Sequence, residues 1–229
     1  MSISENIREI RSRIAAAAIK SGRKEEDILL LAVSKTVEAE RIRLAMQAGL
    51  TTLGENRVQE MMGKYELLPD AKWHLIGTLQ KNKVKYIIDK TELVHSLCTM
   101  SVANEMQRLC EKQDTYIDVL VEVNVTGEES KSGVSEAELA AFLKDIAELD
   151  RVRVKGLMTI AMYSPLPEET RPCFKRLKQI FDELSHIKRD NFEMKYLSMG
   201  MSGDYEVAIE EGANIVRIGS AIFGERNYN

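Results

Sequence analysis

The chain has 229 residues and a mass of 25.9 kDa, which suits one large α/β domain and is short for two independent hydrophobic cores. Hydrophobic residues make up 44% of the sequence and charged residues 30%, a composition that excludes a disordered or collagen-like chain. The formal net charge of −4 argues against binding to nucleic acid or anionic lipid through bulk charge.

The sequence carries no signal for a membrane or for secretion. Its longest apolar run, residues 28–33, is far shorter than the span of about 20 residues that crosses a bilayer, and the charged N-terminus lacks a secretory apolar stretch. The three cysteines, Cys98, Cys110 and Cys173, match neither a disulfide framework nor the paired spacing of a zinc site. We therefore expect a cytoplasmic protein with reduced thiols, no bound metal, and no membrane or nucleic acid partner.

Short apolar runs alternate with longer amphipathic stretches along the chain, a pattern typical of a parallel sheet covered by helices. The N-terminal segment, with isoleucines at positions 3, 7, 10 and 14, has helical spacing, and we expect this helix to cover one end of the fold. Eight strand candidates follow, at residues 28–34, 51–54, 73–77, 93–96, 117–124, 154–160, 195–199 and 215–219.

Helical stretches separate these strand candidates. The clearest covers residues 136–149, and the next begins near Glu168 with prolines at its start. The alternation predicts a single (β/α)8 barrel of the TIM type with an extra N-terminal helix. Because no linker-like segment divides the chain, we interpret residues 1–229 as one domain.

In such a barrel, chemistry takes place where the strands end at their carboxyl side. The first strand ends in Ala32-Val33-Ser34-Lys35, so a lysine stands at the predicted mouth of the barrel. A lysine partly removed from water has a lowered pKa, and its neutral amine can attack a carbonyl group. Lys35 is therefore a candidate for forming a Schiff base, or it only marks where the strand emerges into water.

Polar residues also follow the second strand and lie on the third and fourth. The amide of Asn56 can hydrogen-bond a ring hydroxyl group or cap the following helix, and we interpret its neighbours Glu55 and Arg57 as ordinary first-turn charges. We place His74 and His95 near the mouth, as hydrogen-bonded packing residues rather than general acids or bases.

Two segments near the end of the chain are typical of the two halves of an anion site. Ser202 and Gly203 follow the seventh strand and offer a hydroxyl group and backbone N–H groups. The eighth strand provides the cation of Arg217. Gly219 permits close approach of the backbone, and Ser220 offers a further donor. The alternative is a helix cap at Ser202 and an ion-paired Arg217, and the nearby Asp204 counts against an anion.

Together these residues resemble the pyridoxal phosphate homeostasis protein family, short relatives of the barrel domain of bacterial alanine racemase. The resemblance covers nearly the whole chain. It is carried by residues 32–35 (AVSK), 54–60 (GENRVQE), 73–83 (WHLIGTLQKNK), 156–159 (GLMT), 197–202 (LSMGMS) and 217–224 (RIGSAIFG). Several long motifs in this order are far more specific than a single glycine pattern.

The resemblance implies that Lys35 holds pyridoxal 5′-phosphate as a Schiff base and that Asn56 lies near the ring hydroxyl group. The residues that it implies around the phosphate are Ser202, Gly203, Arg217, Gly219 and Ser220, with Arg217 also reaching the ring nitrogen. An arginine there disfavours protonation of the nitrogen and weakens the cofactor as an electron sink. The implied function is intracellular vitamin B6 homeostasis, as a carrier or buffer that serves apo-enzymes dependent on the cofactor.

Two positions depart from the family pattern. Cys98 stands where we expect an acidic residue, which puts a contact at that rim in doubt. Gly203 stands where family members often carry a polar residue, which favours a backbone contact with the phosphate over a side-chain contact.

Two enzyme functions remain as alternatives. A pyridoxal-phosphate-dependent amino-acid racemase needs an acid or base on each face of its substrate, and related racemases take one from a second domain that this sequence lacks. Tyr228 is a poor substitute because residues at a chain end fray. A Schiff-base lyase of the aldolase type would need no phosphate site. We expect a binding protein rather than an enzyme, and a monomer because a closed barrel has no free sheet edge.

Overall fold

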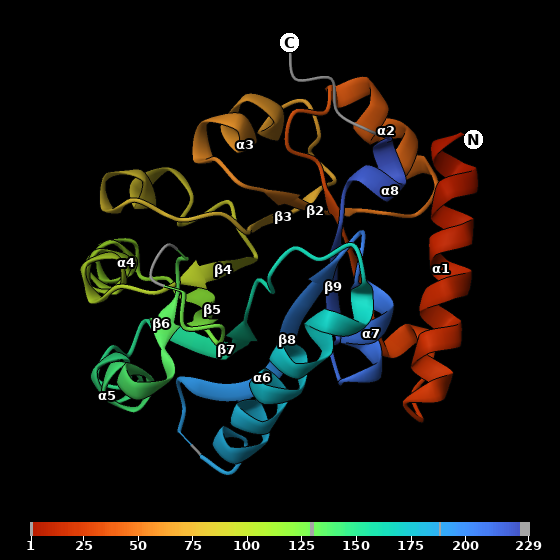
Figure 1. Cartoon of the computed structure of the whole chain (residues 1–229). Helices are drawn as coiled ribbons and strands as arrows, with labels where there is room; N and C mark the ends of the chain where they lie inside the picture. The colour runs from red at the N-terminus through yellow and green to blue at the C-terminus, as the bar shows by residue number, and fades with distance from the viewer. Residues whose placement is uncertain (1, 129–130, 188, 225–229) are drawn as a thin grey trace.

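A computed structural model describes residues 2–128, 131–187 and 189–224 of the chain (Figure 1), so Tyr228 lies outside the described residues. Within those ranges the strands pair in parallel, in the order β4-β3-β2-β1-β9-β8-β7-β5-β6, and an additional pairing of β4 with β5 closes a barrel of eight strands. The barrel strands are β1 (Leu29–Val33), β2 (Thr52–Glu55), β3 (Lys72–Leu75), β4 (Leu93–Leu97), β5 (Ile117–Asn124), β7 (Val152–Met158), β8 (Phe192–Met201) and β9 (Ile215–Ile218). The predicted TIM-type barrel is confirmed.

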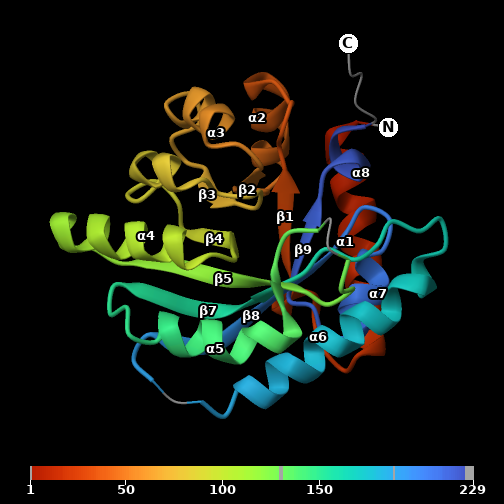
Figure 2. The same ribbon diagram turned by 60° about the vertical axis from the view of Figure 1, so that its left-hand side comes forward.

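Helices form the outer layer of the barrel (Figures 1 and 2). They are α2 (Ala39–Gln47), α3 (Val58–Tyr65), α4 (Met100–Gln113), α5 (Glu136–Ile146), α6 (Arg171–Leu184), α7 (Tyr205–Glu210) and α8 (Ser220–Phe223). Three 3-10 helices, η1 (Glu25–Asp27), η2 (Lys81–Tyr86) and η3 (Pro167–Thr170), and the two-residue strand β6 (Val134–Ser135) complete the described elements. No helix of the described residues is long and apolar enough to cross a membrane.

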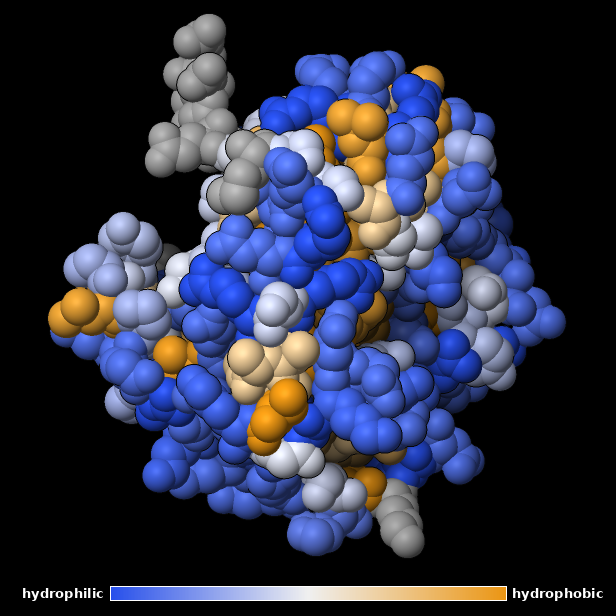
Figure 3. All heavy atoms as spheres, turned by 90° about the vertical axis from the view of Figure 1, so that its right-hand side faces the viewer, coloured by the Kyte–Doolittle hydropathy of each residue, from blue (hydrophilic) through white to orange (hydrophobic). Residues whose placement is uncertain are grey.

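The N-terminal helix α1 (Ile3–Lys20) lies on the outer wall of the barrel, and the expectation that it covers one end is wrong. It packs against α7, α8 and α2 (Figure 1). The helix buries Ile7 and Ile14, and Asn6 Nδ2 donates to the carbonyl oxygen of Ile222 at 2.9 Å. The helix lies there because the eighth strand and helix pair, β9 and α8, is incomplete. The helix α8 has only four residues, too few to cover β9 and β1. The apolar face of α1 takes that place. Its outer face is mostly hydrophilic, with hydrophobic residues in small separate groups (Figure 3).

Strand and helix boundaries differ from the predictions by a few residues. The strand predicted at 117–124 is β5 as expected, whereas β8 begins at Phe192, three residues earlier than predicted, because Phe192 is buried and pairs with Val154. The helix expected from Glu168 begins as η3 and becomes α-helical at Arg171, with a proline in its first turn. The start of β8 alternates buried and exposed residues, so it has no continuous apolar run and the sequence did not indicate it as strand.

The interior of the barrel is filled by side chains and is not a pore. Its inner apolar cluster consists of Leu31, Val33, Ile76, Leu93, Leu120, Met158 and Ile215. A second, larger apolar layer lies between the strands and the helices. A ligand can therefore enter only at an end of the barrel, and the polar residues predicted to bind one follow the carboxyl ends of the strands.

Candidate functional site

A cavity of about 600 Å³ opens at the carboxyl ends of β1, β2, β8 and β9. It brings together every residue that the sequence analysis predicts for the site: Lys35, Asn56, Ser202, Gly203, Arg217, Gly219 and Ser220. The segment after β7 adds an exposed rim that includes Ile160, Met162 and Tyr163. Closure of the barrel places these residues around one space, although they follow strands far apart in the sequence.

Lys35 lies in a strained turn that follows β1. Its side chain is half-buried and lines the cavity, and the next residue, Thr36, has a φ of 62°, in the left-handed region. A threonine in that region costs about 1–3 kcal/mol and persists only where its surroundings hold it. Here the N–H of Thr36 donates to Glu60 Oε1, a contact that helps to fix the turn.

A buried network of charges fixes the backbone on the other side of Lys35. Glu55 is fully buried at the end of β2, and its Oε1 accepts from the Ser34 hydroxyl at 2.7 Å and from Lys64 Nζ at 2.8 Å. Lys64 also donates to the carbonyl oxygen of Ser34 at 2.8 Å and to Glu60 Oε1 at 3.0 Å. Burial raises the pKa of Glu55, and the bonds from Lys64 and Ser34 oppose that rise.

The interpretation of Glu55 as an ordinary first-turn charge is wrong. The sequence holds a signal that could have found its role, because a carboxylate at the end of a short buried strand needs a partner, and Lys64 follows on the adjacent helix. Arg57, by contrast, is exposed at the N-cap position of α3.

Asn56 is half-buried in the turn between β2 and α3 and lines the cavity. Because Arg57 is the N-cap of α3, Asn56 does not cap that helix. Its backbone lies against Gly77, where a Cβ atom would approach the carbonyl oxygen of Asn56 to 2.4 Å. A glycine at position 77 is therefore needed for Asn56 to lie where it does.

Ser202 joins the loop after β8 to the beginning of α8. Its Oγ accepts the N–H of Gly219 at 3.3 Å and the N–H of Ala221 at 3.4 Å. Asp204, not Ser202, is the N-cap of α7, so the helix-cap alternative for Ser202 does not hold. Ser202 Oγ thus accepts two backbone N–H groups of this wall, and its own hydroxyl proton is a donor of the kind that a phosphate needs.

Gly203 and Asp204 continue this wall. Gly203 is exposed, and a Cβ atom there would meet nothing within 4 Å, so packing does not require a glycine. Asp204 Oδ1 accepts the N–H of Met201 at 2.6 Å. Burial raises the pKa of Asp204, and the hydrogen bond from Met201 and the charge of Arg217 oppose that rise.

Arg217 lies inside the barrel beneath the mouth and is only 4% exposed. It donates to Ser198 Oγ at 2.7 Å and to the carbonyl oxygen of Thr159 at 2.9 Å. Burial lowers the pKa of Arg217 to about 10, so the guanidinium group stays charged at neutral pH. No carboxylate of the described residues lies within ion-pair distance of Arg217, so the ion-pair alternative does not hold.

Glu122 is a buried carboxyl group that sequence reasoning missed. It lies on β5, is 4% exposed, and lines a cavity of about 230 Å³ that shares three residues with the larger one. Burial raises the pKa of Glu122, and the charge of Arg217 opposes that rise. Burial and the nearby Glu122 also raise the pKa of the Cys98 thiol. The acidic residue expected at position 98 is absent, and the neighbouring strand supplies a carboxyl group close to that position.

His74 and His95 lie deeper in the barrel than predicted, so their placement near the mouth is wrong. His95 is fully buried and His74 lines a cavity at the amino ends of the strands. Ile76 and Arg217, rather than the histidines, line the cavity at the mouth. Burial lowers the pKa of His95 well below its usual range and that of His74 to about 4.

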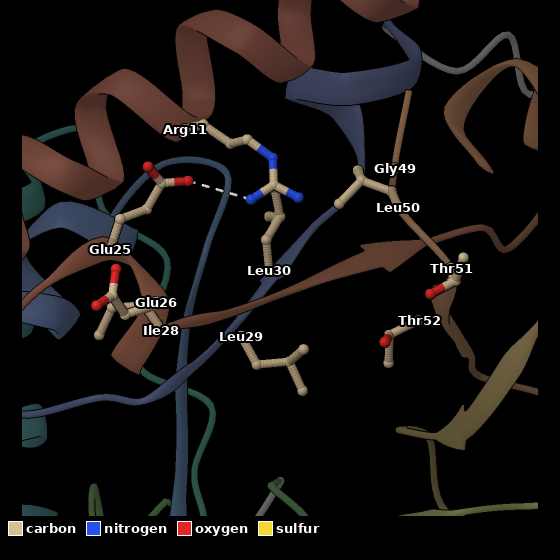
Figure 4. Close-up of a pocket in the computed structure, with 10 residues that line it drawn as sticks. All are labelled: Arg11, Glu25, Glu26, Ile28, Leu29, Leu30, Gly49, Leu50, Thr51 and Thr52. Atoms are coloured by element: carbon tan, nitrogen blue, oxygen red, sulfur yellow. Dashed lines mark hydrogen bonds and ion pairs between the residues drawn. The ribbon is translucent and has the colours of Figure 1, made fainter. Parts of the chain in front are cut away.

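Another cavity, of about 470 Å³, lies where β1 begins (Figure 4). Arg11 of α1 and Glu25 of η1 form an ion pair of 3.1 Å on one side of it, and Thr51 and Thr52 lie on the other. It contains none of the predicted site residues, and barrels of this type build their sites at the opposite end. Over the described ranges, no group of His, Cys, Asp or Glu could hold a metal ion. The cavity at the mouth is therefore the candidate functional site.

Comparison with known proteins shows the family of the chain. Residues 2–227 match the family model described as alanine racemase, N-terminal domain. A pyridoxal phosphate homeostasis protein from Aquifex aeolicus is 48% identical over 230 residues, with 100% of both chains covered. The chain belongs to this family of pyridoxal phosphate homeostasis proteins.

Solved structures at higher and lower sequence identity share the fold. PipY from Synechococcus elongatus, with PLP (pyridoxal 5′-phosphate) bound, is 31% identical, with a TM-score of 0.84, over 97% of this chain and 100% of PipY. Alanine racemase from Corynebacterium glutamicum is 16% identical, with a TM-score of 0.68, over 95% of this chain and 61% of that one. The second likeness is one of fold alone.

Proposed function

We propose that this protein binds pyridoxal 5′-phosphate, holds it on Lys35, and acts in intracellular vitamin B6 homeostasis. The observation that carries the proposal is that one cavity is lined by Lys35 and, from the segments after β8 and β9, by Ser202, Gly219 and Ser220. A PLP-bound relative that is 31% identical, and full-length relatives named for pyridoxal phosphate homeostasis, support it.

The residues present fit each part of this cofactor. The cofactor's aldehyde would condense with the Lys35 amine with loss of water, a reversible covalent attachment. Asn56 would hydrogen-bond the ring hydroxyl group, and the phosphate would lie against Ser202, Gly203, Gly219 and Ser220. Arg217, held deeper by Ser198 and Thr159, would supply a positive charge and N–H donors to the phosphate and the ring nitrogen.

The protein would act as a buffer or carrier rather than as an enzyme. Reversible attachment keeps the reactive aldehyde low in free solution and returns it when the free concentration falls. We propose that it works in the cytoplasm as a monomer and supplies apo-enzymes that depend on the cofactor. Direct delivery is tested by the rate at which a recipient apo-enzyme gains activity. A rate no faster than release into bulk solution would contradict direct delivery.

The cofactor site is tested by the visible absorption spectrum of the purified protein before and after borohydride, followed by peptide mass mapping. We expect a yellow protein that bleaches, with the reduced cofactor fixed on Lys35. Lys35→Ala should remove the colour and the labelled peptide, whereas Lys144→Ala, at an exposed position on α5, should change neither. A protein that stays colourless with added pyridoxal 5′-phosphate would overturn the proposal.

The racemase alternative needs its own assay. The loaded protein is incubated with single amino-acid enantiomers, and formation of the mirror form is followed. We expect turnover no higher than that of free cofactor. Turnover well above that level would establish an enzyme, and loss of it in Lys35→Ala would assign the activity to this site.

A further inference from the structure

A chain of hydrogen bonds runs through the interior of the barrel from Arg217 toward the opposite end. Arg217 donates to Ser198 Oγ at 2.7 Å, and Ser198 Oγ lies 2.9 Å from His95 Nδ1. His95 Nε2 lies 2.9 Å from His74 Nδ1. The four residues come from β9, β8, β4 and β3, and each is at least nine-tenths buried. None of the roles proposed above uses the two histidines.

The direction of this chain follows from its first member. A guanidinium group has donors only, so Ser198 Oγ must accept from Arg217. The Ser198 hydroxyl proton then needs an acceptor, and His95 Nδ1 is the one acceptor that the described contacts offer it. If His95 Nδ1 carried a proton instead, the fully buried Ser198 hydroxyl proton would have no partner, which costs about 1–3 kcal/mol.

The remaining protons follow in order. His95 carries its proton on Nε2 and donates it to His74 Nδ1, so His74 carries its own proton on Nε2. His74 Nε2 lies 3.9 Å from Glu92 Oε2 and faces the cavity at the amino ends of the strands. A proton on that nitrogen suits the neighbouring carboxylate, which is a second reason for the same direction. Both rings are neutral in this arrangement, as their lowered pKa values require.

We propose that His95 and His74 are positioning residues for the cofactor site: as neutral Nε2–H tautomers they complete a one-way chain that fixes the Ser198 hydroxyl and, through it, the guanidinium plane of Arg217. With Thr159 accepting from its other amino group, Arg217 is held from two sides. The role of Arg217 toward the cofactor rests on the proposed function, whereas the direction of the chain does not.

The chain direction is tested by proton–nitrogen correlation NMR of the histidine rings in the cofactor-free protein. The sequence has three histidines, and the exposed His186 is assigned by His186→Gln. We expect His95 and His74 to show a protonated Nε2 and a bare Nδ1. In Ser198→Ala, which deletes one oxygen atom, the two rings should show mixed tautomers. A proton on Nδ1 of either ring in the unmodified protein would overturn the chain.

The positioning role is tested with two substitutions of the same side chain. His95→Asn keeps an oxygen that can accept from Ser198, whereas His95→Leu keeps bulk and loses the acceptor. We expect His95→Leu to shift the absorption maximum of bound pyridoxal 5′-phosphate and to weaken its binding roughly tenfold, the equivalent of one neutral hydrogen bond. His95→Asn should restore most of both properties.

The two experiments separate this inference from the proposed function. An unchanged spectrum and unchanged affinity in His95→Leu would overturn the positioning role. If the unmodified protein binds no pyridoxal 5′-phosphate, the proposed function fails, and the ring tautomers of the cofactor-free protein still decide whether the chain has the stated direction.

Discussion

At the scale of single residues, the buried polar groups around the candidate site differ in whether they have hydrogen-bond partners. Lys35 is held through its neighbours, by Glu55 and Lys64 on one side and Glu60 on the other. Glu122 is different, because it is buried without an ion pair or side-chain hydrogen bond among the described contacts. The residues around Lys35 are stabilised by these bonds, whereas burial of Glu122 lowers the stability of the fold beside the cavity at the mouth.

Glu122→Gln should stabilise the protein at neutral pH. Burial raises the pKa of Glu122 above its ordinary 4.5, so the folded protein binds this proton more tightly than the unfolded chain does. The stability linked to this group is therefore fully present below pH 4.5 and is lost as the pH rises through the raised pKa. Urea unfolding at several pH values should show the variant more stable at neutral pH and the difference shrinking in acid. The exposed Glu66→Gln is the control, and a difference that grows in acid would contradict the assignment.

Gly77→Ala should displace Asn56. The new Cβ atom would lie 2.4 Å from a backbone oxygen that cannot rotate away, and such overpacking costs about 1–3 kcal/mol. We expect a lower urea midpoint and weaker cofactor binding. Gly203→Ala, which enters open space in the same cavity, should change the midpoint little. Equal effects of the two substitutions would show that the contact at Asn56 is not the cause.

At the scale of elements, the eighth strand and helix unit is incomplete and α1 completes it. The four-residue α8 leaves β1 and β9 uncovered, and the isoleucine face of α1 packs there beside α7 and α2. The helix α1 is first in the sequence, and in the outer layer of the barrel it lies beside α7 and α8, which are last in the sequence. It also contacts α8, whose N-cap Gly219 and first residue Ser220 line the cavity at the mouth, so its packing supports the wall of the candidate site.

Ile14→Ala should destabilise the protein by about 2–5 kcal/mol, because the side chain is 1% exposed and its removal leaves a cavity between α1 and the barrel. Ile19→Ala, on the same helix but 72% exposed, is the matched control and should change stability by less than about 0.5 kcal/mol. Urea unfolding followed by circular dichroism measures both. Similar losses in the two variants would mean that helix propensity, rather than packing, decides the effect.

At the scale of the whole molecule, closure makes one cooperative unit of the strands. The β4 and β5 pairing joins the two ends of the sheet, so the described strands of the barrel all have a neighbour on both sides. The inner apolar cluster draws residues from most of these strands. A break at one strand therefore exposes the edges of its neighbours and the core that they share.

Urea unfolding should follow a single transition, as expected for one domain. Trp73 is the sole tryptophan of the sequence and is buried, so its fluorescence reports on the barrel, while circular dichroism reports on the helices. The two curves should superimpose. Two separated transitions would contradict the interpretation of residues 1–229 as one domain.

The sequence by itself determined the barrel, because eight apolar runs and their helices have local periodicities that do not depend on distant residues. It also predicted seven of the residues that line the cavity, because polar groups follow the buried strands and several long motifs resemble those of one family. The tertiary structure alone decided what lies beneath them. Glu55 pairs with Lys64, and Arg217 donates a hydrogen bond to Ser198. The helix α1, which we expected across one end, covers the outer wall beside α8. Such partners depend on strand register and barrel closure, which no local pattern contains.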